Sequence, residues 1–222
     1  MSELAFVLVG CVVAVHGAAR AAWSPCGQSM LASLTPVAER ARGQSWARTV
    51  TAFAIGAIGA GALAGSLTGA VGSLLPGSGW RAPLVASALV LAIVVDATAL
   101  RRLMPLTRRQ VNEDWMSRYR GWVYGLGFGA QLGFGAITLV ACAAIYATFA
   151  IELAAGSVAA GAAIGATFGA TKAATLLPTW VARDPGSLLG LHRRLLARER
   201  TAQRALIVAE LAALVATAAM LA

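Results

Sequence analysis

A ladder of glycines occurs twice in this chain at one spacing, and it constrains the fold more than any other feature. The first copy comprises Gly56, Gly61, Gly65 and Gly69, and the second comprises Gly156, Gly161, Gly165 and Gly169. Each copy lies in an apolar segment that runs on to a Leu-Leu-Pro sequence, at 74–76 and at 176–178. Small residues at such intervals let helices pack closely in a membrane, and a repeat on this scale predicts two homologous halves.

The composition is that of a membrane protein. Of the 222 residues, 59% are hydrophobic and only 12% are charged, whereas a soluble domain carries about 25% charged residues. A helix needs roughly 20 apolar residues to cross a bilayer. The sequence therefore predicts an all-α, polytopic membrane protein with six transmembrane helices near 4–23, 50–75, 82–100, 121–147, 153–177 and 204–222.

The basic residues indicate how such a protein lies in the membrane. The net charge of +9 is concentrated in three connecting segments, 36–49, 101–120 and 178–203. Cytoplasmic loops are enriched in Lys and Arg, so we expect a multi-pass protein of the inner (plasma) membrane with both termini extracytoplasmic. This distribution predicts contacts with the lipid bilayer rather than with nucleic acid.

Three spans in each half would place the second half upside down relative to the first. We therefore expect a single transmembrane domain, 1–222, built as two inverted three-helix repeats of about 1–105 and 115–222. The glycine ladders have two readings. They pack helices against each other, or they line a path for a substrate.

The segment around Cys26 predicts an interrupted first span. As one straight helix, residues 4–35 would be about 48 Å long, against a hydrocarbon core of about 30 Å. The span must therefore tilt strongly or break near Pro25 and Gly27, because proline removes an amide donor and glycine loosens the backbone. A thiol at the end of a half-helix would be more acidic, and more reactive, than that of Cys11.

The run Ser24-Pro25-Cys26, with Pro36 downstream and six spans in inverted halves, resembles the CcdA-type and DsbD transmembrane family. The resemblance implies a carrier of reducing equivalents from a cytoplasmic thioredoxin-like protein to extracytoplasmic thiols, with one cysteine in the first span of each half. The second half departs from that pattern. Its segment 125–135 has alternating glycines, which predict a second soft or broken helix near Gly127–Gly133. The segment contains Gln131 but no cysteine, which leaves Cys142 as the candidate partner of Cys26.

Two functions follow, and the sequence leaves both open. As an electron carrier, the chain would use Cys26 and Cys142 as its exchanging, catalytic thiols. As a small-solute or ion transporter on the same scaffold, it would bind its substrate through residues of the two broken spans: Arg20, Pro25, Gly27, Gln28 and Gln131. A non-catalytic subunit of a membrane complex is a third class, and in that case the cysteines are small apolar core residues.

Ionisable side chains within the predicted spans are candidate functional groups, because charge is costly there. The sequence offers His16, Arg20, Asp96, Lys172 and Glu210. Asp96 could pair with the nearby Arg101, and Arg20 could pair with Glu210. No metal site is predicted, because the chain has only two histidines and they lie far apart. No phosphate-binding loop is present either, and we expect no cofactor.

Overall fold

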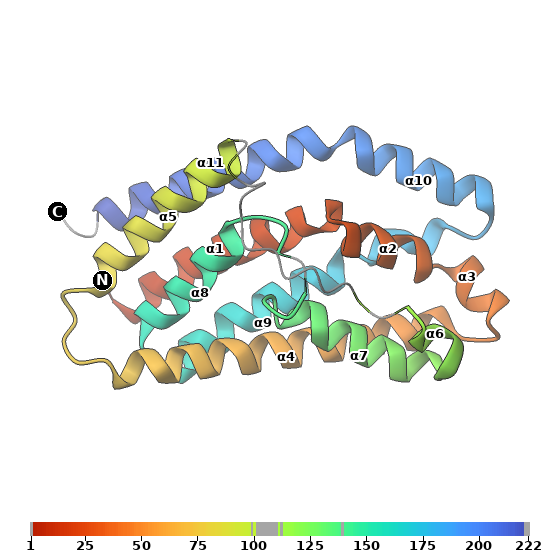
Figure 1. Ribbon diagram of the computed structural model, residues 1–222, viewed down its shortest axis with the longest axis horizontal. Coiled ribbons are helices and arrows are strands. Elements are labelled where there is room, and N and C mark those ends of the chain that lie inside the picture. The colour runs from red at the N-terminus through yellow and green to blue at the C-terminus, as the bar shows by residue number, and fades with distance from the viewer. Residues whose placement is uncertain (1, 99, 101–110, 112, 139, 220–222) are drawn as a thin grey trace.

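The computed structural model describes all residues except 1, 99, 101–110, 112, 139 and 220–222, and the regular elements of the described chain are all helices (Figure 1). The N-terminal part comprises α1 (Glu3–Arg20), the 3-10 helix η1 (Ala21–Trp23), α2 (Pro25–Ser33), α3 (Pro36–Ala41), α4 (Trp46–Leu74) and α5 (Arg81–Ala97). The rest comprises α6 (Trp115–Arg118), α7 (Gly121–Gly133), α8 (Ala144–Ala155), α9 (Val158–Ala174), the 3-10 helix η3 (Leu177–Val181), α10 (Pro185–Ala197) and α11 (Glu199–Ala219).

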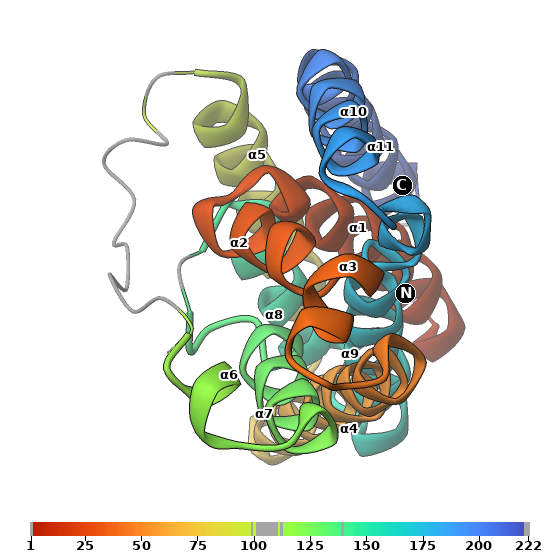
Figure 2. The same cartoon turned by 90° about the vertical axis from the view of Figure 1, so that its right-hand side faces the viewer.

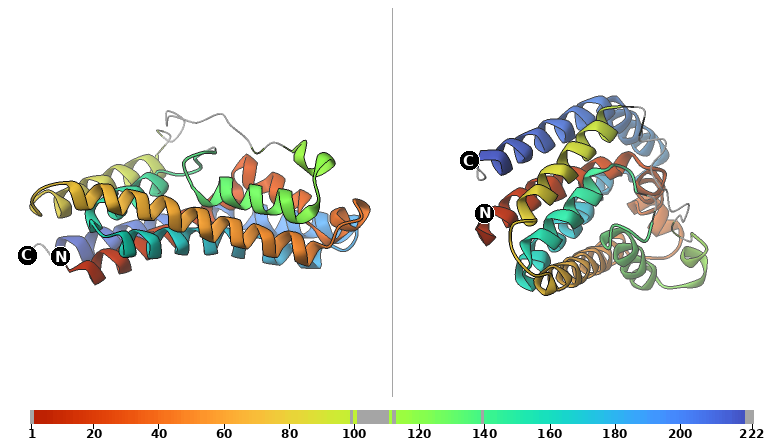
Figure 3. Two further views of the ribbon diagram at one scale, coloured as in Figure 1. Left: turned by 90° about the horizontal axis from the view of Figure 1, so that it is seen from below. Right: turned by 60° about the vertical axis from the view of Figure 1, so that its left-hand side comes forward.

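The helices form an elongated bundle with α4 along one side and α10 and α11 along the other (Figures 1 and 3). The start of α1 and the end of α11 lie at the same end of this bundle. The opposite end carries α3 and α6, and Figure 2 looks at the molecule from that end. Between these ends, α4 packs along both α7 and α9.

The expected six single-helix spans are not supported. In the described chain, three helices are both long and apolar enough to cross a membrane: Glu3–Trp23, Trp46–Leu74 and Glu199–Ala219. The shortfall has two physical causes. Helices α5 and α9 have only 17 residues each, and the expected span 121–147 is divided between α7 and α8.

The first span breaks beside Pro25, close to the predicted position. Helix α1 ends at Arg20, η1 tightens the chain, and Ser24 is extended with φ −74° and ψ 159°. The Ser24 hydroxyl accepts a hydrogen bond from the Gly27 amide at 3.1 Å, and Pro25 occupies the first turn of α2. A serine cap followed by proline is a strong signal for a helix start, so the break follows from local sequence.

The expected break within the second glycine run is wrong in its position. Helix α7 is continuous to Gly133, and the interruption follows it, between α7 and α8. Gly125, Gly129 and Gly133 of α7 face the backbone of α4, and a Cβ on Gly129 or Gly133 would meet the carbonyl oxygen of Phe53 or Ala57, respectively. This close packing keeps an intrinsically soft sequence helical, because tertiary contacts outweigh helix propensity.

The two glycine ladders pack directly against each other. Gly61 of α4 opposes Gly165 of α9, and Gly65 opposes Gly161, so the two helices run antiparallel. Each glycine in these pairs would, with a Cβ, collide with the carbonyl oxygen of the other. The reciprocal contact is what a two-fold relationship between halves produces, while the repeats of 1–105 and 115–222 stay a prediction.

Candidate functional site

Cys26 lies in an apolar cluster. Its side chain is only 3% exposed, and it packs in a group of buried residues that includes Met30, Leu132 and Leu176. Its neighbours on α2 differ from it, since Pro25 is exposed and Gly27 folds against the carbonyl oxygens of η1. The structure therefore surrounds this thiol with hydrocarbon rather than with water.

Cys142 lies in a different part of the core. It is 1% exposed and belongs to a cluster of α1, α5, α8 and α9 side chains, where its Sγ donates to the carbonyl oxygen of Gly17 at 3.6 Å. Cys11, Cys26 and Cys142 are all free thiols. Lys172 of α9, itself 9% exposed, interacts electrostatically with both Cys26 and Cys142. No disulfide therefore joins Cys26 to Cys142.

The two predicted glutamines occupy separate helices. Gln28, on α2, is half-buried, and among the described residues its Oε1 and Nε2 atoms find no hydrogen-bond partner. Gln131 is half-buried on α7. In the described part of the chain, the Gln28 amide forms no hydrogen bond with Cys26.

Arg20 is the centre of a polar cluster that links α1, α5 and α11. Its side chain is 6% exposed, and its Nε donates to Gln203 Oε1 at 2.6 Å. A second donor, Nη2, pairs at 3.2 Å with Glu199, whose side chain is 46% exposed. Gln203 in turn donates through Nε2 to the backbone carbonyl of Asp96 at 2.8 Å. Arg20 and Gln203 together thus connect the three helices, Arg20 joining α1 to α11 and Gln203 joining α11 to α5.

Asp96 caps helix α8 from another helix. Its Oδ1 and Oδ2 atoms accept the backbone amides of Ala143 and Ala144 at 2.9 and 3.1 Å, at the point where α8 begins. These amides have no partner within their own helix, and a carboxylate there is also favoured by the helix dipole. The expected pairing with Arg101 lies outside the described residues.

Glu210, on α11, is fully buried near Asp96. Both of its carboxyl oxygens lack a hydrogen-bond partner with adequate geometry in the described part of the chain, although the group interacts electrostatically with Asp96. The pair of Arg20 with Glu210 that the sequence allows does not form, because Arg20 pairs with Glu199 instead.

Another buried carboxylate, Glu39, is not among the predicted site residues. It is 0% exposed and accepts hydrogen bonds from Tyr124 at 2.7 Å, Thr49 at 2.6 Å and Arg42 at 2.5 Å. Burial lowers the pKa of Arg42, but the hydrogen bonds with Glu39 and Tyr124 outweigh burial and raise the pKa above its ordinary value. Glu39 therefore fastens α3, α4 and α7 at one end of the bundle as a fully paired ion.

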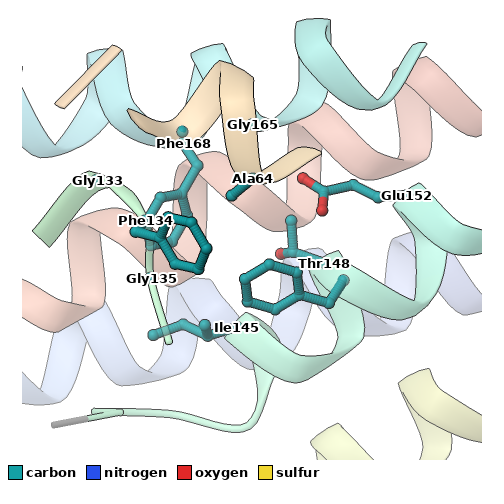
Figure 4. A pocket seen from close by; sticks show the side chains of 11 residues that line it. Ala64, Gly133, Phe134, Gly135, Ile145, Thr148, Glu152, Gly165 and Phe168 are labelled. Carbon is teal, nitrogen blue, oxygen red and sulfur yellow. The ribbon is translucent and has the colours of Figure 1, made fainter. Parts of the chain in front are cut away.

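The buried carboxylate of Glu152, on α8, lines a small cavity between α4, α8 and α9 (Figure 4). It is 2% exposed, and its Oε2 has no hydrogen-bond partner among the described residues. Its only sequence signal is a single acid inside the apolar run 144–155. No group of three or more potential metal ligands occurs in the described chain.

The chain is similar to proteins named methylamine utilization protein MauF. It is 33% identical to that of Methylophilus methylotrophus over 168 residues, which is 72% of this chain and 58% of the relative. It is 35% identical to that of Methylobacillus flagellatus over 153 residues, 66% of this chain and 54% of the relative. The match in Paracoccus denitrificans is 31% identical over 154 residues. The chain thus spans just over half the length of the curated relatives it matches.

No protein-family model matches the chain. No solved structure matches it either.

These comparisons overturn the resemblance to the CcdA-type and DsbD family. The relatives that cover most of the chain carry a name that concerns methylamine utilization, not thiol–disulfide exchange. The expected electron carrier, with Cys26 and Cys142 as its exchanging thiols, is therefore wrong, and the transporter alternative gains no better support. The motif itself has a local explanation, because Ser24 and Pro25 start a helix.

Proposed function

We propose that this chain is an integral membrane protein that serves methylamine utilization. The observation that carries the proposal is the similarity to MauF of Methylophilus methylotrophus, with 33% identity over 72% of this chain. Because the chain covers 58% of that relative, the role is proposed for the shared helical part. Its substrate and its protein partners are not named by this similarity.

The exposed apolar side chains support insertion in a bilayer. On α4, four large apolar residues on the outer face are 53–62% exposed: Ile55, Leu63, Leu67 and Val71. Helix α5 exposes Leu91 in the same way, at 64%. Hydrocarbon surface of this extent is costly in water and is satisfied by lipid tails, so we propose that the bilayer is the chain's principal contact.

The positions of the chain ends support an even number of passages through the membrane. The start of α1 and the end of α11 lie at one end of the bundle (Figure 1). Three crossings would place them at opposite ends. We propose six passages: α1, α4, α5, α7 together with α8, α9, and α11. The 17-residue helices α5 and α9 would be about 26 Å long, slightly less than the hydrocarbon core of about 30 Å.

The positive charge supports the orientation. Arg40, Arg42 and Arg48 lie around the connection between α3 and α4, at the end of the bundle opposite the start of α1 (Figure 1). We propose that this end faces the cytoplasm and that both termini are extracytoplasmic, in the cell's inner (plasma) membrane. The two inverted halves, 1–105 and 115–222, belong to the same proposal.

A deletion in the organism that encodes the chain tests the function. The deleted strain should grow poorly with methylamine as its sole nitrogen source and normally with ammonium chloride. A plasmid copy should restore growth, and so should the control Glu113→Gln, which changes an exposed carboxyl on the surface. Equal growth of the deleted and parent strains on methylamine would overturn the proposal.

A further inference from the structure

The cavity beside Glu152 combines one buried carboxylate with aromatic walls. Phe134 follows α7, Phe149 belongs to α8 and Phe168 belongs to α9, and all three line the space together with Thr148 and Glu152 (Figure 4). The glycine ladder creates this space. Gly61 and Gly165 form part of the wall, and a Cβ on Gly65 would lie 3.0 Å from Glu152 Oε1.

The charge of Glu152 has nothing in the described protein to balance it. The side chain is 2% exposed, its Oε2 has no hydrogen-bond partner among the described residues, and it forms none of the ion pairs found in that part of the chain. An isolated ionised carboxylate in apolar surroundings costs several kcal/mol. The site is therefore stable with a proton on the carboxyl or with a bound cation against it.

The walls suit a cation that also has an apolar part. The face of a phenyl ring attracts a cation within about 6 Å of its centre, and Phe168 already has the Lys172 ammonium at 5.5 Å. Thr148 donates its hydroxyl hydrogen to the carbonyl oxygen of Ala144 at 2.9 Å. Its oxygen therefore has lone pairs free to accept from an N–H group. Carboxylate, hydroxyl and rings together match a protonated amine.

The size of the cavity limits the guest. The centre of a water-sized sphere has about 10 Å³ in which to move, which is space for one water molecule. An ammonium ion has that size. A methyl group on it would find room only where a phenyl side chain of the wall moves aside, and it would then contact the rings. Bulkier amines would have to displace the backbones of α4 and α9, which already touch at the glycines.

We infer that the Glu152 cavity binds the smallest ammonium cations, ammonium and methylammonium, with the charged nitrogen at Glu152 and the methyl group toward the phenyl rings. The choice of methylammonium rests on the proposed function. The cation site itself rests on the unpaired carboxylate, the rings and the volume. The cations would bind at this site without chemical change.

Calorimetric titration of the purified full chain in lipid nanodiscs tests this site. The probes are methylammonium, ammonium, tetramethylammonium and sodium chloride, at constant ionic strength. Methylammonium should bind saturably, and tetramethylammonium and sodium should not. Tighter binding of methylammonium than of ammonium supports a contact of the methyl group with the rings, whereas equal affinity shows a site for the ammonium group alone. Absence of saturable binding by both would overturn the inference.

Two matched variants identify the site. Glu152→Gln keeps the shape of the side chain and should weaken methylammonium binding at least tenfold. Glu210→Gln removes an equally buried carboxyl that does not line the cavity, so it should bind like the parent. Equal binding by Glu152→Gln and the parent would contradict the assignment. If Glu152→Gln does not fold, Phe149→Leu replaces it as the test variant. That substitution removes one phenyl ring from the cavity wall and should weaken methylammonium binding at least threefold.

The titration and the growth experiment test separate claims, so one claim can be overturned without the other. Binding without a growth phenotype would leave the cation site and overturn the role in methylamine utilization. A growth phenotype without binding would leave that role and overturn the site.

Discussion

Gly65 of α4 and Gly161 of α9 lie back to back, each where a Cβ atom would strike the carbonyl oxygen of the other. The relationship repeats one turn away at Gly61 and Gly165. In lipid, helices gain little from hiding apolar surface, so close van der Waals contact between backbones is a principal source of their association. The interface of α4 with α9 is such a contact, and it also makes the space that Glu152 enters.

Gly161→Ala tests the contact between the ladders. The added methyl group must push two helix backbones apart, and overpacking of this kind costs about 1–3 kcal/mol. Gly59→Ala, on the facing helix α4, is the control, because a Cβ there would meet nothing within 4 Å. It should stabilise the helix by up to about 1 kcal/mol. Unfolding in mixed micelles with increasing dodecyl sulfate measures both. Equal stability of the two variants would contradict the contact.

Asp96→Ala tests the cap on α8. It leaves the amides of Ala143 and Ala144 buried without an acceptor, at a cost on the order of 3 kcal/mol. Asp96→Asn keeps one oxygen acceptor and should lose about half as much stability. Hydrogen exchange at Ala144 should speed up most in the alanine variant. Unchanged exchange at that amide would show that the cap does not hold the helix.

Tyr124→Phe tests the Glu39 cluster. The hydroxyl donates to a carboxylate that is 0% exposed, so its loss should cost about 1.5–3 kcal/mol. Tyr119→Phe removes a hydroxyl from a side chain that is 51% exposed and should change the stability by less than about 0.5 kcal/mol. Micellar unfolding of both variants provides the comparison, and equal effects would rule against a paired buried ion.

Maleimide labelling of single-cysteine variants tests the surroundings of the thiols. Cys26 and Cys142 are 3% and 1% exposed, so both should resist N-ethylmaleimide in the folded protein and react after denaturation. Cys11 is partly exposed and should react first, which is the opposite of the order expected from the sequence. Faster labelling of Cys26 than of Cys11 would show that the Cys26 cluster opens to reagent.

Asp184 makes the stability of the first turn of α10 dependent on pH. Its Oδ1 accepts from the Ser187 amide at 2.9 Å, and this hydrogen bond lowers the pKa of the Asp184 carboxyl below its ordinary value of 3.8. Because the pKa is lower in the capped helix, the stabilisation is fully present above pH 3.8 and is lost as pH falls through the lowered pKa. Hydrogen exchange in the first turn of α10, corrected for intrinsic rate, should show this loss in the parent.

Asp184→Asn is the control for this titration, because asparagine caps helices as well as aspartate does and does not titrate. Protection of the first turn of α10 should therefore be independent of pH in the variant. The same acid-dependent loss in both proteins would assign the effect to another group.

Local features of the sequence predicted local features of the fold. Apolar composition predicted an all-helical chain, and the pair Ser24-Pro25 with Gly27 predicted a break in the first span. A prediction failed where the shape of one helix depended on its contacts with another helix. Alternating glycines predicted a broken helix at 127–133, but α7 is regular there because α4 supports it.

The candidate site depended still more on the tertiary structure. Cys26 had a distinctive local sequence, yet folding places it among apolar side chains. Glu152 had no motif at all, and the cavity beside it exists only because helices distant in sequence meet there. Similarity to MauF, which follows the whole pattern of residues, also corrected a family assignment that one three-residue motif had suggested.

The sequence by itself determined the helical class, the repeated ladder and the start of α2, because backbone propensity, residue size and capping act over a few neighbouring residues. Only the tertiary structure decided that the two ladders face each other, that Asp96 caps a helix 47 residues away, and that Glu152 is left without a partner. These relationships depend on which helix faces meet and in what register. Short-range preferences leave both undetermined, because many helix pairings satisfy the same local pattern.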